Sequence, residues 1–181
     1  MWPPTANQRG PRFGVQFASK FKLDGTTVCI VPRAASRSMV QTLRAAGAEP
    51  ENIPEGRCVM WIRHPFDRFA TVAMMFGKSY GDGKFQNLAD NILLGDYNQH
   101  WWPQTDLHPE ASIIYPFDTL HDTWKIEFPD LPLRWENKSG QKGVARVPWD
   151  EIEPQLNPET VTALREYYAK DFQAYELSLT R

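Results

Sequence analysis

The chain has 181 residues, of which 41% are hydrophobic and 23% charged, a composition typical of a folded globular protein. Its formal net charge of −2 gives no overall basic field, so composition does not favour nucleic acid as a partner. No apolar run approaches the roughly 20 residues that span a bilayer, and the first residues lack the pattern of a signal peptide. We therefore expect a cytoplasmic protein without a membrane partner, and the oligomeric state stays open.

The beginning of the chain divides into an arm and the start of a domain. Residues 1–12 contain three prolines and no periodicity, which predicts an extended N-terminal arm. Residues 13–181 are expected to form a single α/β domain. Within it, the alternating apolar residues of 13–23 and the turn signal Asp24-Gly25 predict a β-hairpin that leads into a strand at 27–31.

A helix and a second buried strand are expected to follow. Ser38 and Gln41 have the spacing of a capping box, which predicts Ser38 as the N-cap of a helix that stops at Gly47. An apolar run then predicts a strand at 58–62. Strand, helix and strand within about 35 residues form a right-handed βαβ unit. The expected fold class is therefore α/β, with a short parallel β-sheet flanked by helices.

The remaining elements are predicted from shorter patterns. Asn157 and Pro158 supply a cap and a proline at the first helical position, which together mark the start of the last helix. Helices are expected at 69–76, 85–93, 117–124 and 158–172, and strands at 112–115 and 131–135.

Cys29 and Cys58 both fall inside the predicted buried strands. A disulfide is possible if these strands are neighbours, but reduced thiols in the core of a cytosolic protein are the favoured interpretation.

Each of the two buried strands ends in a loop that is rich in arginine and hydroxyl groups and opens a helix. Helix N-termini present N–H groups and partial positive charge, so both loops are candidate anion sites. Two such sites side by side predict a ligand with two separated anionic groups. The first loop lacks the Walker lysine and no acidic partner for magnesium follows, so we expect no metal. The residues concerned are Arg33, Ala34, Ala35, Ser36, Arg37 and Ser38 in the first loop, and Arg63, Arg68 and Thr71 in the second.

Three segments resemble motifs of the sulfotransferases that use 3′-phosphoadenosine 5′-phosphosulfate (PAPS). The first loop, residues 32–38, is similar to the family's Pro-Lys-x-(Gly/Ala)-Ser-x-Ser. Residues 63–71 are similar to Arg-(Asp/His)-Pro-(Phe/x)-(Asp/Glu)-Arg-x-x-Ser. Residues 98–104 resemble the His-Trp-x-Pro segment of the carbohydrate branch, with its Golgi-type, bacterial and phage-like members. A closing segment, residues 168–172, falls in the order that this branch shows.

The resemblance implies a P-loop-like sulfotransferase fold and a donor with two phosphate ends. PAPS would be the donor, 3′-phosphoadenosine 5′-phosphate (PAP) the product, and a hydroxyl group, expected on a glycan, the acceptor. The first loop, from Arg33 to Ser38, would hold the 5′-phosphosulfate, while Arg63 and Thr71 would hold the 3′-phosphate. Arg33 departs from the family lysine: it keeps the charge but cannot act as a proton donor.

His100 is the candidate general base, since histidine titrates near neutral pH. Without the resemblance, a structural or surface histidine would be the favoured interpretation. Trp101 and Trp102 could form a sugar-stacking platform or belong to the core. Arg68 is expected to brace a carboxylate rather than to touch a ligand.

Two rival functions remain. A non-catalytic module could bind PAPS or PAP and have lost turnover when arginine replaced lysine at Arg33. A kinase-like phosphoryl transferase is disfavoured because the Walker lysine and the magnesium acids are missing.

Overall fold

The computed structural model describes residues 20–76, 83–96, 98–134 and 147–180. The predicted arm at 1–12 and the first part of the predicted hairpin segment lie outside these residues. The assignment of residues 13–181 to a single domain stays a prediction.

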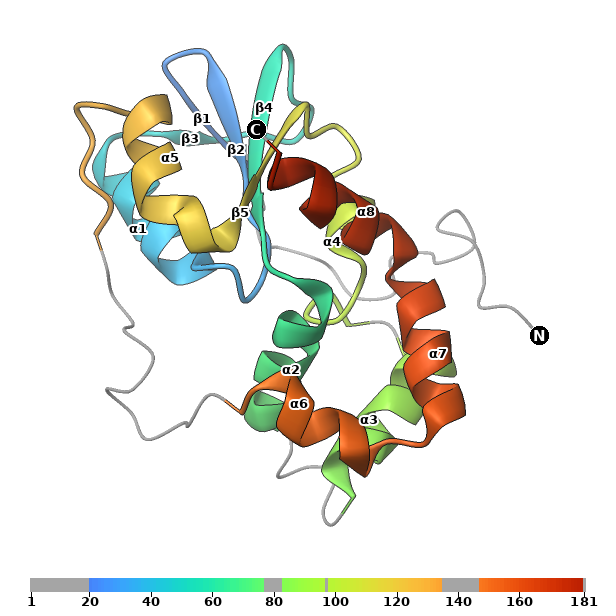
Figure 1. Cartoon of the computed structure of the whole chain (residues 1–181). Helices are drawn as coiled ribbons and strands as arrows, with labels where there is room; N and C mark the ends of the chain where they lie inside the picture. Colours follow the sequence, from blue (N-terminus) through green and yellow to red (C-terminus); the bar gives the residue numbers. More distant parts are fainter. Residues whose placement is uncertain (1–19, 77–82, 97, 135–146, 181) are drawn as a thin grey trace.

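The described strands form one five-stranded mixed sheet (Figure 1). Their spatial order is β3 (Glu49–Pro50), β1 (Lys20–Leu23), β2 (Thr26–Cys29), β4 (Arg57–Ile62) and β5 (Ile113–Pro116). β2 pairs with β4 and β4 with β5 in parallel, whereas β1 pairs antiparallel with both β2 and β3. The α/β class is thus confirmed, but the expected parallel sheet is limited to three of the strands.

The hairpin between β1 and β2 is confirmed. Its turn residues Asp24 and Gly25 have φ angles of 48° and 78°. A two-residue turn with positive φ at both positions matches the twist of the flanking strands, and Asp-Gly is a preferred sequence for it. The edge strand β3 was not foreseen, because Glu49–Pro50 lies in a segment that looked like a polar connection.

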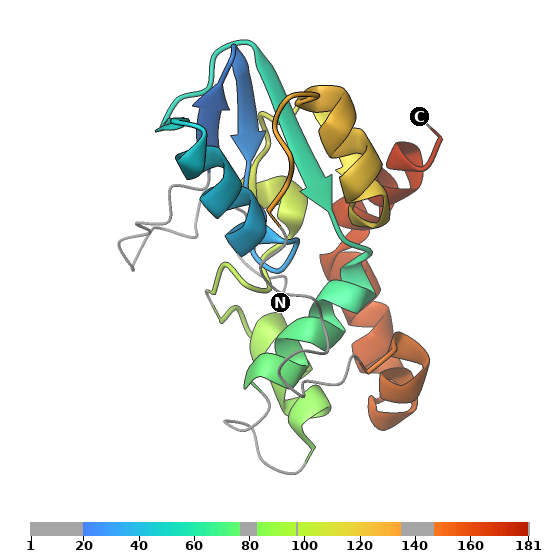
Figure 2. The ribbon, with the colours of Figure 1, turned by 90° about the vertical axis from the view of Figure 1, so that its left-hand side faces the viewer.

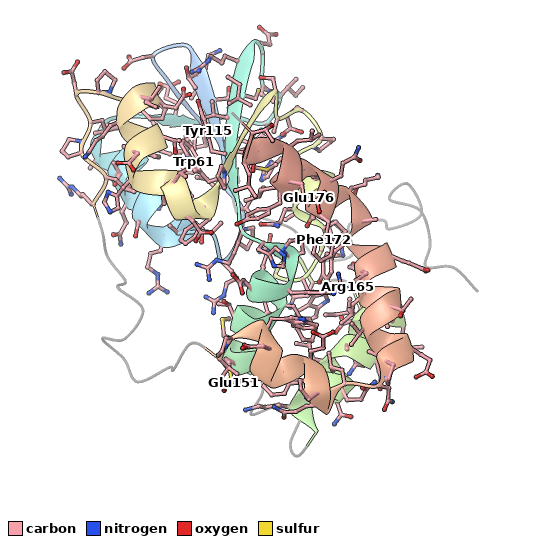
Figure 3. All side chains as sticks on the ribbon, in the orientation of Figure 1. Trp61, Tyr115, Glu151, Arg165, Phe172 and Glu176 are labelled. Atoms are coloured by element: carbon pink, nitrogen blue, oxygen red, sulfur yellow. The ribbon has the colours of Figure 1, made fainter. Side chains whose placement is uncertain are left out.

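Helices cover both faces of the sheet, and the alternation of side chains along β4 explains why. Val59 and Trp61 face a cluster with α1 (Ser36–Ala45) and α5 (Leu120–Glu127), where Trp61 and Tyr115 stack at 5.6 Å between ring centroids (Figure 3). Cys58 and Met60 point to the opposite face, where residues of α8 (Ala169–Ser178) pack. Strand side chains alternate between faces, so one apolar run supplies both cores.

A separate group of helices packs beyond the carboxyl end of β4 (Figures 1 and 2). These helices have their own buried cluster, which includes Phe66, Leu88 and Leu164. The group comprises α2 (Pro65–Phe76), α3 (Lys84–Leu93), α6 (Trp149–Ile152) and α7 (Pro158–Tyr167). The short α4 (Gln104–Leu107) contacts α8, and 3₁₀ turns lie at η3 (Phe117–Thr119) and η4 (Glu153–Gln155).

Two predicted elements differ from the structure, the last helix and the strand at 131–135. The last helix begins at Pro158 as expected, but Asn157 makes no side-chain capping hydrogen bond and the helix breaks at Tyr168 into α7 and α8. Residues 131–134, the described part of the predicted strand at 131–135, form no strand. Cys29 and Cys58 are buried free thiols, as expected of thiols in the core. Within the described part of the chain, no helix is long and apolar enough to cross a bilayer.

Candidate functional site

The backbone of the first loop adopts a conformation that side chains rarely allow. Arg33 and Ala35 have φ angles of 73° and 51°, whereas Ala34 between them does not have a positive φ. Each left-handed non-glycine residue costs about 1–2 kcal/mol. Successive residues of alternating hand turn their N–H groups toward one side, which is the pattern of anion-binding nests. The small, fully buried Ala34 lets the chain turn tightly, and its N–H donates to the Val31 carbonyl at 3.1 Å.

The helix after this loop starts earlier than predicted. Ala35 in its left-handed conformation is the N-cap, α1 begins at Ser36, and the Met39 N–H donates to the Ala35 carbonyl at 3.0 Å. The predicted capping box is therefore wrong, and Ser38 lies buried in the first turn of the helix. The physical reason is that a strained backbone, rather than a hydroxyl cap, turns the chain into the helix. The N-terminal end of α1 thus lies directly next to the nest.

Positive charge gathers at this loop, and no carboxylate of the described residues forms an ion pair with Arg33 or Arg37. Arg33 is half-buried, and its Nε atom has no hydrogen-bond partner among the residues that the structure describes. Burial lowers the pKa of Arg33, and the nearby charges of Arg37 and Arg68 lower it further. A buried donor without an acceptor costs about 1–3 kcal/mol, so the loop has a physical reason to bind an anion. Arg37 is exposed and Ser36 half-buried, which leaves both within reach of solvent.

The second loop brings Arg63 and Thr71 together, as the sequence predicted. One Nη of Arg63 donates to Thr71 Oγ1 at 3.0 Å, and that hydroxyl donates to the Asp67 carbonyl at 2.8 Å. The Arg63 guanidinium also lies 4.3 Å from the centre of the Phe117 ring, a cation–π contact that fixes its plane. The two side chains are therefore held in place within this loop.

Arg68 was expected to brace a carboxylate, but its partners among the described residues are backbone carbonyls. Its side chain is only 2% exposed and donates to three backbone carbonyls, those of Pro32, Gln99 and Trp102. Burial lowers the pKa of this guanidinium. Five N–H donors in a rigid fork allow one arginine to satisfy carbonyls from separate segments. Arg68 thereby ties the first loop to the segment that carries His100.

His100 is placed with a defined tautomer. The Oδ1 atom of Asn98 accepts a hydrogen bond from the His100 backbone N–H at 3.0 Å and lies 2.7 Å from His100 Nδ1. Because that oxygen is an acceptor, Nδ1 carries the proton and the lone pair is on Nε2. Burial lowers the pKa of His100, and the positive charges of Arg33 and Arg68 lower it further. The imidazole is therefore neutral at neutral pH and able to accept a proton.

A network that sequence reasoning missed holds the His100 segment against the second loop. The buried Asp171 of α8 accepts hydrogen bonds from the backbone N–H groups of Gln104, at 2.7 Å, and Thr105, at 2.9 Å. The Gln104 amide in turn exchanges hydrogen bonds of 2.8 and 2.9 Å with the backbone of Arg63. Tyr168 adds a hydrogen bond from its hydroxyl to the Trp101 carbonyl at 2.7 Å. The only sequence signal for these contacts was the order of the motif at 168–172.

The neighbouring aromatic residues have mainly structural positions. Trp101 is 3% exposed and donates to the Asp96 carbonyl, so it belongs to the core and offers no stacking platform. Trp102 is half-buried. His64 packs edge-on against Phe172 and Tyr175, both at 5.3 Å between ring centroids, which is a structural position.

No protein-family model, curated protein or solved structure matches the chain. Function is therefore inferred from the residues at the carboxyl ends of β2 and β4, the edge at which open α/β sheets commonly bind ligands.

Proposed function

We propose that the protein is a PAPS-dependent sulfotransferase that transfers a sulfuryl group to a hydroxyl acceptor, expected to be a carbohydrate. The observation that carries this proposal is a buried arginine donor without a partner at Arg33, close enough to a neutral His100 to lower its pKa. Transfer from an anionic donor to a hydroxyl group requires an anion-binding group and a proton acceptor at the same site.

The two loops suit the two ends of the donor. In this proposal the nest and helix start from Arg33 to Ser38 bind the 5′-phosphosulfate. Ala34 shapes the turn, because its N–H already donates to the Val31 carbonyl, while Ala35, Ser36 and Arg37 lie beside the anion. Arg63 and Thr71, which already contact each other, bind the 3′-phosphate. All of these groups are donors or cations, and the chemistry needs no metal ion.

His100 and Arg33 have separate roles in the proposed reaction. PAPS supplies a sulfuryl group whose bond to the 5′-phosphate breaks as the acceptor oxygen bonds to sulfur. His100 accepts the acceptor's hydroxyl proton at Nε2, the nitrogen that its tautomer leaves basic. Arg33 and the loop N–H groups stabilise the electron pair left on the phosphate oxygen by hydrogen bonding. Arg33 cannot give up a proton, so the leaving phosphate departs as an anion.

A non-catalytic PAPS- or PAP-binding module is the second candidate, and the arginine in place of the family lysine is what favours it. Incubation of the protein with sulfur-labelled PAPS and a panel of glycans, peptides and phenols separates the two. Transfer by the wild-type protein supports the enzyme. PAP binding in calorimetry without transfer, together with transfer gained by Arg33→Lys, would establish the binding module instead.

A further inference from the structure

A second cluster of chemically active side chains lies on the other face of the sheet from α1. Cys29 ends β2, while His108 and Glu110 lie in the connection between α4 and β5. Cys29 Sγ lies 3.8 Å and His108 Nδ1 3.3 Å from the same Glu110 oxygen, Oε1. One ligand atom from each residue lies within 4.8 Å of the other two. Residues far apart in the sequence thus present sulfur, nitrogen and oxygen to one point.

Two of the three ligand separations fit a tetrahedral metal site, and the third, between Cys29 Sγ and His108 Nδ1, is at most 4.8 Å. Zinc binds sulfur at about 2.3 Å and nitrogen or oxygen at about 2.0–2.2 Å, which separates neighbouring ligand atoms by roughly 3.3–3.8 Å. The separations of Cys29 Sγ and His108 Nδ1 from Glu110 Oε1 fall in this range. Thiolate, imidazole and carboxylate together select zinc over magnesium or calcium.

A second partner orients the histidine. His108 Nε2 lies 3.0 Å from the Ile30 carbonyl, an acceptor, so Nε2 carries a proton and Nδ1, which faces Glu110 Oε1, is the nitrogen left for a metal ion. A metal-binding histidine almost always donates its other N–H to a carbonyl or carboxylate in this way. His108 is only 2% exposed, so this orientation is fixed by packing as well.

A cation already balances the carboxylate in the absence of metal. Lys20 Nζ lies 2.8 Å from Glu110 Oε1, the oxygen on which the cluster converges. The side chains of Lys20 and Glu110 are 18% and 23% exposed, which gives a metal ion a route from solvent. Burial raises the pKa of the Cys29 thiol, and the Glu110 charge raises it further.

We propose that Cys29, His108 and Glu110 bind one zinc ion that fastens β2 to the connection between α4 and β5, with Lys20 as the displaceable cation of the metal-free form. On binding, the Cys29 thiol releases its proton to solvent and sulfur bonds to zinc, while water completes the four ligands. This site is separate from the proposed transfer site and does not depend on the proposed function.

The test uses the full chain, stripped with a chelator and titrated with zinc against a competing chromophoric chelator. One zinc per chain is expected. Cys29→Ser and Glu110→Gln should weaken binding by roughly 10- to 100-fold or more, since even an outer partner of a ligand is worth that much. Lys20→Met should tighten binding by on the order of tenfold, because it removes a like charge. Cys58→Ser is the matched control, a buried thiol on the next strand outside the cluster, and should bind zinc as the wild type does.

Cobalt substitution gives a readout that does not depend on the variants folding. Cobalt bound to the wild-type chain should show a thiolate charge-transfer band in the near ultraviolet. Absence of stoichiometric zinc, absence of that band, or equal loss of binding in Cys58→Ser and Cys29→Ser would each overturn the proposal.

Discussion

The loops after β2 and β4 occupy equivalent positions at the ends of neighbouring parallel strands, yet they are built differently. The first loop contains two left-handed residues, Arg33 and Ala35. The second loop holds Arg63 on a hydroxyl and an aromatic ring. Strain at the first loop indicates that a ligand completes it, whereas contacts within the second loop already hold Arg63.

The largest expected change in stability comes from substitution of Arg68, because this side chain joins the first loop to the His100 segment. Arg68→Met leaves three partly buried carbonyls without their donor and should lower the free energy of unfolding by about 3–6 kcal/mol. Denaturant unfolding measures this. The exposed Arg44 of α1 is the control, and Arg44→Met should change stability by less than about 1 kcal/mol. Equal effects of the two substitutions would contradict the bracing role of Arg68.

The two loops are expected to bind different ends of the donor, so a substitution in the second loop should affect only ligands that carry a 3′-phosphate. Arg63→Ala should weaken binding of PAP by roughly 10- to 100-fold, the value of a charge-assisted contact of about 1.5–3 kcal/mol. Adenosine 5′-phosphosulfate lacks the 3′-phosphate, so its binding should change little. Calorimetry with both ligands measures the difference. Equal losses for the two ligands would remove Arg63 from the 3′-phosphate role.

The positive charge of the first loop should lower the pKa of His100. Its pKa should lie below the usual value of about 6.5, because burial and the nearby arginines disfavour the imidazolium. Arg33→Ala removes one of those positive charges, so it should raise the His100 pKa and shift the titration to higher pH. An NMR titration of the ring proton measures this without any assay of activity. The exposed Arg37 is the control, and Arg37→Ala should move the curve less; a larger shift from Arg37→Ala would place the interaction elsewhere.

The smallest expected change in stability comes from relief of the backbone strain at Ala35. Ala35→Gly removes the penalty for a left-handed alanine and should raise the free energy of unfolding by about 0.5–1 kcal/mol, less the extra chain entropy of glycine. Ala163 in α7 provides the control, because Ala163→Gly in a regular helix should lower stability by about 1 kcal/mol. Destabilisation by both substitutions would mean that the first loop is not strained.

Local signals predicted the elements that surround the site. The apolar runs at 27–31 and 58–62 and the Asp24-Gly25 turn identified two central strands and a hairpin, because burial and turn geometry are encoded over a few residues. The clustering of Arg63 with Thr71 followed from their positions in one turn-and-helix segment.

Contacts between distant segments were not predictable in the same way. Ser38 has the chemistry of a cap, but the chain enters α1 through a strained Ala35, which no propensity favours. Arg68 and Asp171 find backbone partners more than thirty residues away, and such partners leave no pattern in the sequence. The helix break at Tyr168 likewise coincides with a tertiary hydrogen bond to the Trp101 carbonyl.

The most direct test of the central claim is the effect of His100→Ala on sulfuryl transfer from labelled PAPS, measured beside PAP affinity in the same preparation. His121, an exposed histidine of α5, supplies the control substitution. If His100 is the general base, His100→Ala should lower turnover by roughly 10²–10⁴-fold and leave PAP affinity nearly unchanged, whereas His121→Ala should alter neither. Normal turnover by His100→Ala would contradict the proposed mechanism and place the base elsewhere.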